Sequence, residues 1–406
     1  MIITMRVLWV TNIVFPDALD GSRSSLGGGW MTSLLDLIKD EVQLGVVSRY
    51  SCSFNKEVNG VEYYLLRDWR KEICHVLESF KPDIIHLHGS EYEHSLIVKE
   101  LAIGIPCVCS VQGLVSVYSR YALGGLTYNE ILRNITIKDL LRKSGPCSIQ
   151  KDQKNRGLFE TRLFENLRYA IGRTQWDMEH VKSIDSKIEY FYCSESLRDC
   201  FYDGIWSIEK ANRYTLFCCN SSVPLKGVHQ IVKALPIIKR QYPDVSLRIA
   251  GKNILGKLSI KERLRMSGYD AFLRGLIYKL NLQDNIKFLG ALSAGEIKKE
   301  LLSCNAFVLA SSIENSPNSL AEAQILGVPI ACSNVGGVAT MMGNNFMEYT
   351  YRFEEYEMLA QLVMRIFQRK NWNDYSLQMQ EMARSRHNRQ SIKTDLLNIY
   401  SHITNG

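Results

Sequence analysis

Two glutamates separated by seven residues, Glu314 and Glu322, are the side chains of this sequence best placed to do chemistry. The first is expected in a loop and the second inside the following helix, near its start. Amides at a helix N-terminus hold phosphate groups. One carboxylate and these amides could therefore face a phosphorylated sugar, while the other carboxylate reaches neighbouring hydroxyls. The residues expected to bind beside the pair are Asn315, Ser316, Asn318 and Ser319.

A buried strand and a short helix are expected to position this pair. The apolar residues 306–310 predict the strand. Pro317 suits the first turn of the helix with Ser316 as its N-cap, and Gly327 ends it. For an isolated pair of glutamates, two solvated carboxylates flanking an ordinary turn would be the simpler interpretation.

The wider motif around the pair carries a family resemblance. The two glutamates are followed by the run Gly-Val-Pro-Ile at residues 327–330 and then by Gly336 and Gly337. This pattern resembles the retaining, nucleotide-sugar-dependent glycosyltransferases of family 4. The run Gly-Arg-Thr-Gln-Trp-Asp at residues 172–177 is similar to runs in members of that family linked to bacterial surface polysaccharides. The resemblance implies the GT-B fold, in which two Rossmann-like doubly wound domains face a cleft. It is strongest over residues 214–340 and diffuse over residues 1–195.

A lysine at the start of the second half, Lys226, is the expected cation of the site. It precedes Gly227 and a helical run over residues 228–235. In the family this lysine binds the nucleotide diphosphate, a role suited to a compact ammonium. The family places an arginine five or six residues earlier, where this chain has Ser221 and Asn220, so another donor must replace it. A surface lysine after a turn is the alternative.

Two further strand ends of the second half are expected beside the nucleotide. Gly251 closes the strand over residues 247–250, and Leu289 lies where the family's base contacts backbone and apolar side chains. Neither segment separates uracil from guanine, so UDP- and GDP-sugars both remain open.

The first half opens with a strand, a glycine loop and a helix, which is the start of a Rossmann-type unit. Gly28 and Gly29 end the loop, and glycine lets the backbone approach a ligand closely. Gly28 is assigned to donor binding and Gly29 to the acceptor side. The loop lacks the spacing of an NAD site, which we reject.

Histidines near the end of the strand over residues 84–87 are candidates for contact with an acceptor hydroxyl. His86 and His88 lie on one face of it, and His88 is assigned a catalytic role. With Glu91 and His94 they could also be read as metal ligands, although the spacing is poor. We therefore expect no metal.

Two other acceptor-side candidates end strands. Gln112 stands where the family often has a histidine, and glutamine cannot take a proton. Arg173 could meet a phosphate or a sugar carboxylate, or it could fix the following turn through Asp177.

Length and composition favour a two-domain α/β protein. The 406 residues are 46% hydrophobic, with no apolar run long enough to span a membrane. We expect an N-terminal acceptor-side domain over residues 1–200, a hinge near 200–212 and a donor domain over 213–375. In the family the last helix, residues 376–406, packs back on the first domain. The Cys residues, eleven in all, show no zinc spacing and favour reduced thiols in the cytoplasm.

The net charge of +7 is unevenly distributed. Residues 120–156 are basic and carry apolar residues at roughly helical spacing, as in a segment that lies on an anionic membrane. A solvated helix face is the alternative. Because no motif of a nucleic-acid-binding fold accompanies the basic stretch, nucleic acid is not expected as a partner.

These features predict transfer of a sugar from a nucleotide-sugar, with retention, to a saccharide or lipid-linked acceptor at the inner face of the membrane. No cofactor is expected. The alternatives are a nucleotide-sugar epimerase or hydrolase of the same fold, and a catalytically degenerate sugar-nucleotide-binding subunit.

Overall fold

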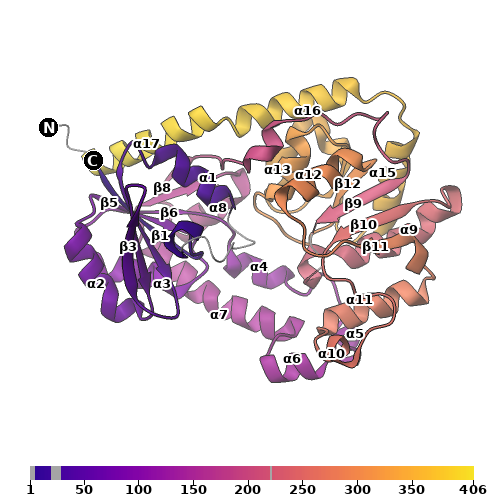
Figure 1. The fold of residues 1–406 in the computed structure, drawn as a ribbon, viewed down its shortest axis with the longest axis horizontal. Coiled ribbons are helices and arrows are strands. Elements are labelled where there is room, and N and C mark those ends of the chain that lie inside the picture. The colour runs from indigo at the N-terminus through magenta and orange to yellow at the C-terminus, as the bar shows by residue number, and fades with distance from the viewer. Residues whose placement is uncertain (1–4, 20–28, 220–221) are drawn as a thin grey trace. The chain divides into compact units, whose positions relative to one another are not determined.

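The computed structural model describes residues 5–19, 29–219 and 222–406, which form two compact units (Figure 1). Unit 1 comprises residues 1–116, 155–198 and 386–406, and unit 2 comprises residues 117–154 and 199–385. Each unit is an α/β structure around one sheet, as the sequence predicted. Residues 117–154 were expected in the N-terminal domain, yet they cluster with unit 2.

Unit 1 is built on an eight-stranded sheet with the strand order β3-β4-β2-β1-β5-β6-β7-β8. The strands are β1 (Arg6–Thr11), β2 (Gln43–Arg49), β3 (Phe54–Val58), β4 (Val61–Leu66), β5 (Ile84–His88), β6 (Cys107–Ser110), β7 (Tyr169–Gly172) and β8 (Glu189–Tyr192). The helices that belong to unit 1 are α1 (Gly29–Ile38), α2 (Trp69–Phe80), α3 (Glu93–Leu101), α8 (Gln175–Ile184), α17 (Arg389–Asn405) and the 3₁₀ turn η1 (Pro16–Leu19).

One edge of this sheet departs from the expected all-parallel arrangement. The strands β3 and β4 form an antiparallel hairpin that was not predicted from the sequence. Its turn is made by Asn59 and Gly60, with φ of 52° and 76°. Asn-Gly with both residues at positive φ is the preferred two-residue hairpin turn, so the signal was present in the sequence.

The C-terminal helix α17 is part of the core of unit 1. Its residues Ile392, Leu396 and Ile399 pack in the same buried cluster as residues of β1, β2 and α1. The hydroxyl of Tyr400 accepts a hydrogen bond of 3.0 Å from Trp9 Nε1, and both side chains are fully buried. Because indole and phenol groups need partners when buried, this bond fixes α17 on the sheet.

Unit 2 is built on a six-stranded parallel sheet with the order β11-β10-β9-β12-β13-β14. The strands are β9 (Thr215–Cys219), β10 (Ser246–Ala250), β11 (Ile286–Phe288), β12 (Ala306–Leu309), β13 (Ile330–Ser333) and β14 (Thr350–Tyr351). Its helices from the main segment are α9 (Val228–Gln241), α10 (Ile260–Leu264), α11 (Gly268–Lys279), α12 (Ala294–Ser303), α13 (Asn318–Ile325), α14 (Val338–Met342), α15 (Tyr356–Gln368) and α16 (Asn373–Arg386). Short 3₁₀ turns are η2 (Asp199–Tyr202), η3 (Pro224–Lys226), η4 (Gln283–Asn285) and η5 (Asn344–Tyr349).

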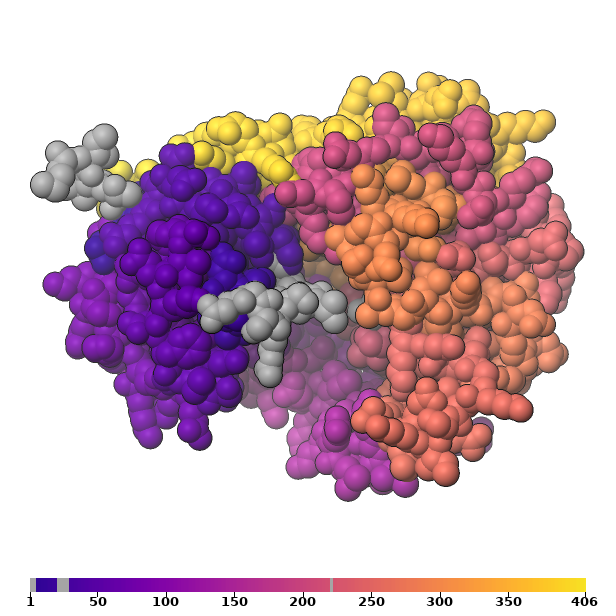
Figure 2. Space-filling model, in the orientation of Figure 1, coloured from indigo at the N-terminus to yellow at the C-terminus, as the bar shows by residue number. Residues whose placement is uncertain are grey.

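Residues 117–154 supply the remaining helices, and polar contacts tie them to unit 2. The helices are α4 (Val115–Tyr121), α5 (Tyr128–Arg133), α6 (Ile137–Arg142) and the first part of α7 (Pro146–Glu165). The fully buried ring of His229 bonds to the carbonyl of Gly124 at 2.9 Å and to the hydroxyl of Tyr269 at 3.0 Å. Figure 2 shows this magenta segment against the salmon residues of α10 and α11.

Among the helices that the structure describes, none combines the length and the apolar character needed to cross a membrane.

Candidate functional site

An ion pair between Lys226 and Glu314 is the centre of the candidate site in unit 2. Lys226 Nζ lies 2.5 Å from Glu314 Oε1, and the hydroxyl of Ser311 donates to the same oxygen at 2.7 Å. The carboxylate side chain is 8% exposed and the lysine side chain 27%. The sequence assigned both residues to one site, and the structure brings them into contact although 88 positions separate them.

Glycines allow the loops that carry this pair to approach each other closely. Gly227 has a φ of +66°, and a Cβ there would lie 1.6 Å from the carbonyl oxygen of Ala310. Gly336 has a φ of +52°, and a Cβ there would lie 1.9 Å from the carbonyl oxygen of Glu314. No side chain fits at either place. The loops after β9, β12 and β13 therefore interlock at the carboxyl edge of the sheet, where open α/β sheets bind ligands.

Helix α13 begins one residue later than predicted. Pro317 is the N-cap, with extended backbone and no capping side chain, and Asn318 is the first helical residue. The proline at this position keeps Ser316 outside the helix, because a residue before proline avoids helical backbone. The amides of Leu320 and Ala321 bond to the carbonyl of Pro317, which leaves those of Asn318 and Ser319 ahead of the first intrahelical bonds.

The other residues assigned to this helix region differ in burial. Asn315 is 1% exposed and Glu322, inside α13, is 3% exposed, whereas Ser316, Asn318 and Ser319 are half-buried. The half-buried side chains and the first amides of α13 are thus the accessible part of this segment.

Gly251 and Leu289 lie where β10 and β11 end. Gly251 and Gly290 exchange two backbone hydrogen bonds of 2.9 Å, and the amide of Leu289 donates to Ile249 at 2.8 Å. Since β10 pairs with β9, these residues share the carboxyl edge that carries Lys226. Their contact with a nucleotide base remains a prediction.

In unit 1, the two histidines of β5 have different surroundings. His86 bonds through Nδ1 to the hydroxyl of Tyr400 and through Nε2 to that of Ser110, each at 2.6 Å. His88 is 1% exposed, and both of its ring nitrogens are buried without a hydrogen-bond partner among the described residues. Its ring stacks on His86, with the ring centroids 3.8 Å apart. Burial, helped by His86 and Arg173, holds the pKa of His88 well below its usual value, so the ring is neutral.

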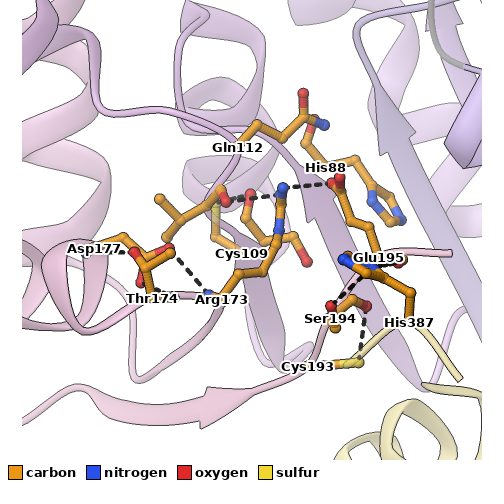
Figure 3. Close-up of polar contacts among 12 residues, drawn as sticks. His88, Cys109, Gln112, Arg173, Thr174, Asp177, Cys193, Ser194, Glu195 and His387 are labelled. Atoms are coloured by element: carbon orange, nitrogen blue, oxygen red, sulfur yellow. Dashed lines mark hydrogen bonds and ion pairs between the residues drawn. The ribbon is translucent and has the colours of Figure 1, made fainter. Parts of the chain in front are cut away.

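Figure 3 shows the surroundings of Gln112 and Arg173, two of the remaining acceptor-side candidates. Gln112 donates from Nε2 to the backbone carbonyl of His88 at 3.2 Å, which ties the ends of β5 and β6 together. Gly29 is the first residue of α1 and lies against the side chain of Arg198. Gly28, Asn220 and Ser221, which were also considered from the sequence, lie outside the described residues.

The side chain of Arg173 is used internally. Its guanidinium forms an ion pair of 2.7 Å with Glu195 and donates to the carbonyl of Val111 at 2.9 Å (Figure 3). Both charged side chains are 7% exposed. The contact with Asp177 is made by the backbone amide of Arg173, not by its guanidinium. Glu195, the partner of this buried cation, was not predicted from the sequence.

Two carboxylates at the same edge of unit 1, the buried Glu160 and the half-buried Glu91, were also not predicted as a pair. Glu160 accepts hydrogen bonds from the hydroxyl of Ser90 and from the hydroxyl and amide of Ser116, at 2.6–3.0 Å. Burial, with a contribution from Glu160, raises the pKa of Glu91 to about 7. Glu91 follows the end of β5, where open α/β sheets bind ligands, and the sequence considered it only as a possible metal ligand. Among the described residues, no group of three or more His, Cys, Asp or Glu side chains is placed to hold a metal ion.

The comparisons with known proteins place a recognisable domain in unit 2. Residues 206–386 match the family described as "Glycosyl transferases group 1". The chain is also 32% identical over 126 residues to the uncharacterized glycosyltransferase YqgM of Bacillus subtilis, a match that covers 31% of each protein. The family match covers less than half of the chain, and the match to this relative spans about a third of that protein's length.

Solved structures resemble the whole chain. The structure of sucrose-phosphate synthase from Thermosynechococcus elongatus has a TM-score of 0.72 at 13% identity, covering 98% of this chain and 99% of that one. Anabaena HepE in complex with UDP and glucose has a TM-score of 0.66 at 15% identity, with the same coverage. At these identities the likeness establishes the fold, which is of the GT-B class.

Proposed function

We propose that the protein transfers a hexosyl group from a UDP-sugar to a saccharide or lipid-linked acceptor, with retention of anomeric configuration, in the synthesis of a surface polysaccharide. The observation that carries the proposal is the Lys226–Glu314 ion pair, held by interlocked glycine loops at the sheet edge of the glycosyltransferase group 1 domain. UDP is preferred over GDP because a solved structure of this fold contains UDP and glucose.

An exchange of partners at Lys226 explains how the pair would work. A diphosphate carries more negative charge than one carboxylate, so it would attract the partly exposed ammonium away from Glu314. The released carboxylate oxygen would then accept hydrogen bonds from hydroxyls of the donor sugar. The first amides of α13 would hold the phosphate, and Glu322 would bind the ribose.

The transition state would be stabilised by the same groups. Negative charge develops on the diphosphate as the bond to the sugar breaks, and a fixed ammonium and helix amides oppose that charge. In unit 1, the neutral ring of His88 is proposed to face the acceptor hydroxyl, since its nitrogens have no partner in the part of the chain that the structure describes. Gln112 and Gly29 are assigned to the acceptor side, and Arg173, whose guanidinium is paired with Glu195, would support that side without contacting the acceptor.

A thermal-shift screen against UDP-, GDP-, ADP- and CDP-sugars, followed by an assay of donor consumption, tests the proposal. We expect stabilisation by a UDP-sugar and transfer to added saccharide acceptors, both unaffected by EDTA because Lys226 and the α13 amides balance the diphosphate charge. Donor epimerisation or hydrolysis without transfer would favour the alternative enzyme class. Binding without any turnover would favour a sugar-nucleotide-binding subunit, and loss of activity in EDTA that Mg²⁺ or Mn²⁺ restores would reject metal independence.

A further inference from the structure

In helix α6 of unit 2, the aspartate side chain is buried and the two leucine side chains are exposed to solvent. The side chain of Asp139 is buried and accepts hydrogen bonds from the amide of Gly268 at 2.7 Å and from the hydroxyl of Thr136 at 3.0 Å. Leu140 and Leu141 are 69% and 81% exposed. A helix of a water-soluble surface normally has the opposite arrangement. Because the start of α11 holds Asp139, the apolar side chains of α6 must face outward.

Helix α10 continues this exposed apolar surface. None of its residues is buried, and Ile260 and Leu264 are 79% and 55% exposed. Leu264, Ile137 and Leu141 line a groove of about 760 Å³ between the two helices. In Figure 1 both helices lie side by side at the lower edge of unit 2. We call these two helices and the groove between them the α6–α10 surface.

Cations surround the apolar residues of this surface. Lys138, Arg142, Lys252 and Arg265 line the groove, and none of them forms an ion pair with a described residue. The acids nearby are already engaged: Asp139 by the contacts above, and Glu262 by the hydroxyl and amide of Ser259. The surface is therefore apolar at its centre and positively charged at its rim.

We propose that the α6–α10 surface docks on an anionic lipid bilayer, with the leucines and isoleucines entering the interface and the cations contacting lipid headgroups. Apolar side chains flanked by Lys and Arg are the pattern of an interfacial membrane contact. A second copy of the chain is a poorer occupant, since a symmetric dimer would set the same cations against each other. The docking residues come from two separate stretches of sequence, so the basic stretch 120–156 supplies only half of them.

Sedimentation with vesicles of equal parts phosphatidylglycerol and phosphatidylcholine tests the proposal on the full-length protein. We expect wild type to pellet at low salt and to be released as the NaCl concentration rises, because salt screens the headgroup contacts. Vesicles of phosphatidylcholine alone should bind weakly. Vesicle binding is measured without donor or acceptor, so its failure would leave the proposed function untouched.

A charge variant with a matched control separates this surface from net charge. Replacing Lys138, Arg142 and Arg265 with Gln should weaken binding by about fivefold for each residue. The control replaces Lys279, Lys287 and Lys299 with Gln as well. These lysines are exposed elsewhere in unit 2. Both variants lower the net charge from +7 to +4, so only the first should lose vesicle binding.

An apolar variant tests insertion. Ile137→Ser with Leu141→Ser should weaken binding at every salt concentration, whereas Met358→Ser with Leu377→Ser, exposed residues of α15 and α16, should not. All four variants should keep the unfolding temperature of wild type, because the replaced side chains are mostly exposed. Failure of wild type to pellet at low salt, or equal loss in variant and control, would overturn the proposal. A dimer in solution that the Ile137 and Leu141 replacements dissociate would also overturn it and assign the surface to a second copy.

Discussion

Among the described residues, the carboxyl edge of each sheet carries an ion pair, Lys226–Glu314 in unit 2 and Arg173–Glu195 in unit 1, and the two pairs differ in solvent exposure. In unit 2 the lysine of the Lys226–Glu314 pair is 27% exposed. In unit 1 the Arg173–Glu195 pair has 7% exposure on both sides, and the guanidinium also bonds to a backbone carbonyl. An open cation can exchange its carboxylate for a ligand, whereas a closed pair holds neighbouring strands together. The difference separates a pair suited to binding from a pair suited to stability.

Arg173→Met should give the largest effect, and it should act on stability. Removing one partner of a buried pair leaves the other charge uncompensated, at a cost of about 3–5 kcal/mol in the free energy of unfolding. Chemical denaturation measures this loss, and the double variant Arg173→Met, Glu195→Leu should recover much of it. A stable Arg173→Met protein that has lost acceptor affinity would instead show that the arginine serves the acceptor.

Gly227→Ala tests whether the close approach of the loops after β9 and β12 holds the Lys226–Glu314 pair in place. The added Cβ meets the carbonyl of Ala310 and the residue must keep a positive φ, so we expect a loss of about 2–5 kcal/mol in stability together with weaker donor binding. Gly256→Ala is the matched control, because Gly256 also has a positive φ but a Cβ added there would have nothing within 4 Å. Calorimetry should show a smaller loss there, about 1–2 kcal/mol. Equal losses would mean that the close approach contributes nothing.

Replacing Lys226, Glu314 or Glu322 should change turnover or donor affinity rather than folding. We expect Lys226→Met and Glu314→Ala to lower turnover, and Glu322→Ala to lower donor affinity, each by about ten- to a hundredfold from the loss of a charge-assisted bond worth roughly 1.5–3 kcal/mol. Steady-state kinetics separates kcat from KM. Wild-type kinetics in the two glutamate variants would reject the assignment.

An effect that depends on pH is expected at Glu91, in the stability of the fold. Its pKa is about 7 when folded, against 4.5 in the unfolded chain, so the folded state holds the proton more tightly. The carboxylate therefore destabilises the fold progressively as pH rises from about 4.5 to 7, and fully above that range. Glu91→Gln should raise the unfolding temperature at pH 8 and change it little near pH 4. An equal shift at both pH values would contradict this account.

The sequence predicted the donor-side elements well because their signals are local. The strand before Glu314 and the end of the helix near Gly327 follow from residues that are neighbours in the chain. The helix boundaries differ by one residue at each end, since α13 begins at Asn318 and its last residue is Ile325 rather than Leu326. The acceptor side depends on partners that the sequence does not connect. Glu195 lies in a segment after a different strand from Arg173, and no residue pattern links them before the fold exists.

The domain assignment of residues 117–154 failed for a similar reason. Their helices have ordinary capping signals, such as Thr136 with Asp139 in α6, which predict a helix but not its neighbour. The element against which α6 packs is determined by long-range contacts, including the hydrogen bond from the amide of Gly268 to Asp139. Side chains that meet across such sequence distances are outside the reach of periodicity and motif arguments.

The chain passes between the two units four times, at residues 116, 154, 198 and 385. Unit 2 is therefore not one continuous stretch of sequence that recombination could move between relatives. A fragment that begins at residue 199 would leave the buried His229 without the carbonyl of Gly124 and would uncover the face of α11 on which α5 and α6 fold. Exchange of donor specificity would have to carry two separated stretches of the gene together, or proceed by point changes within the loops.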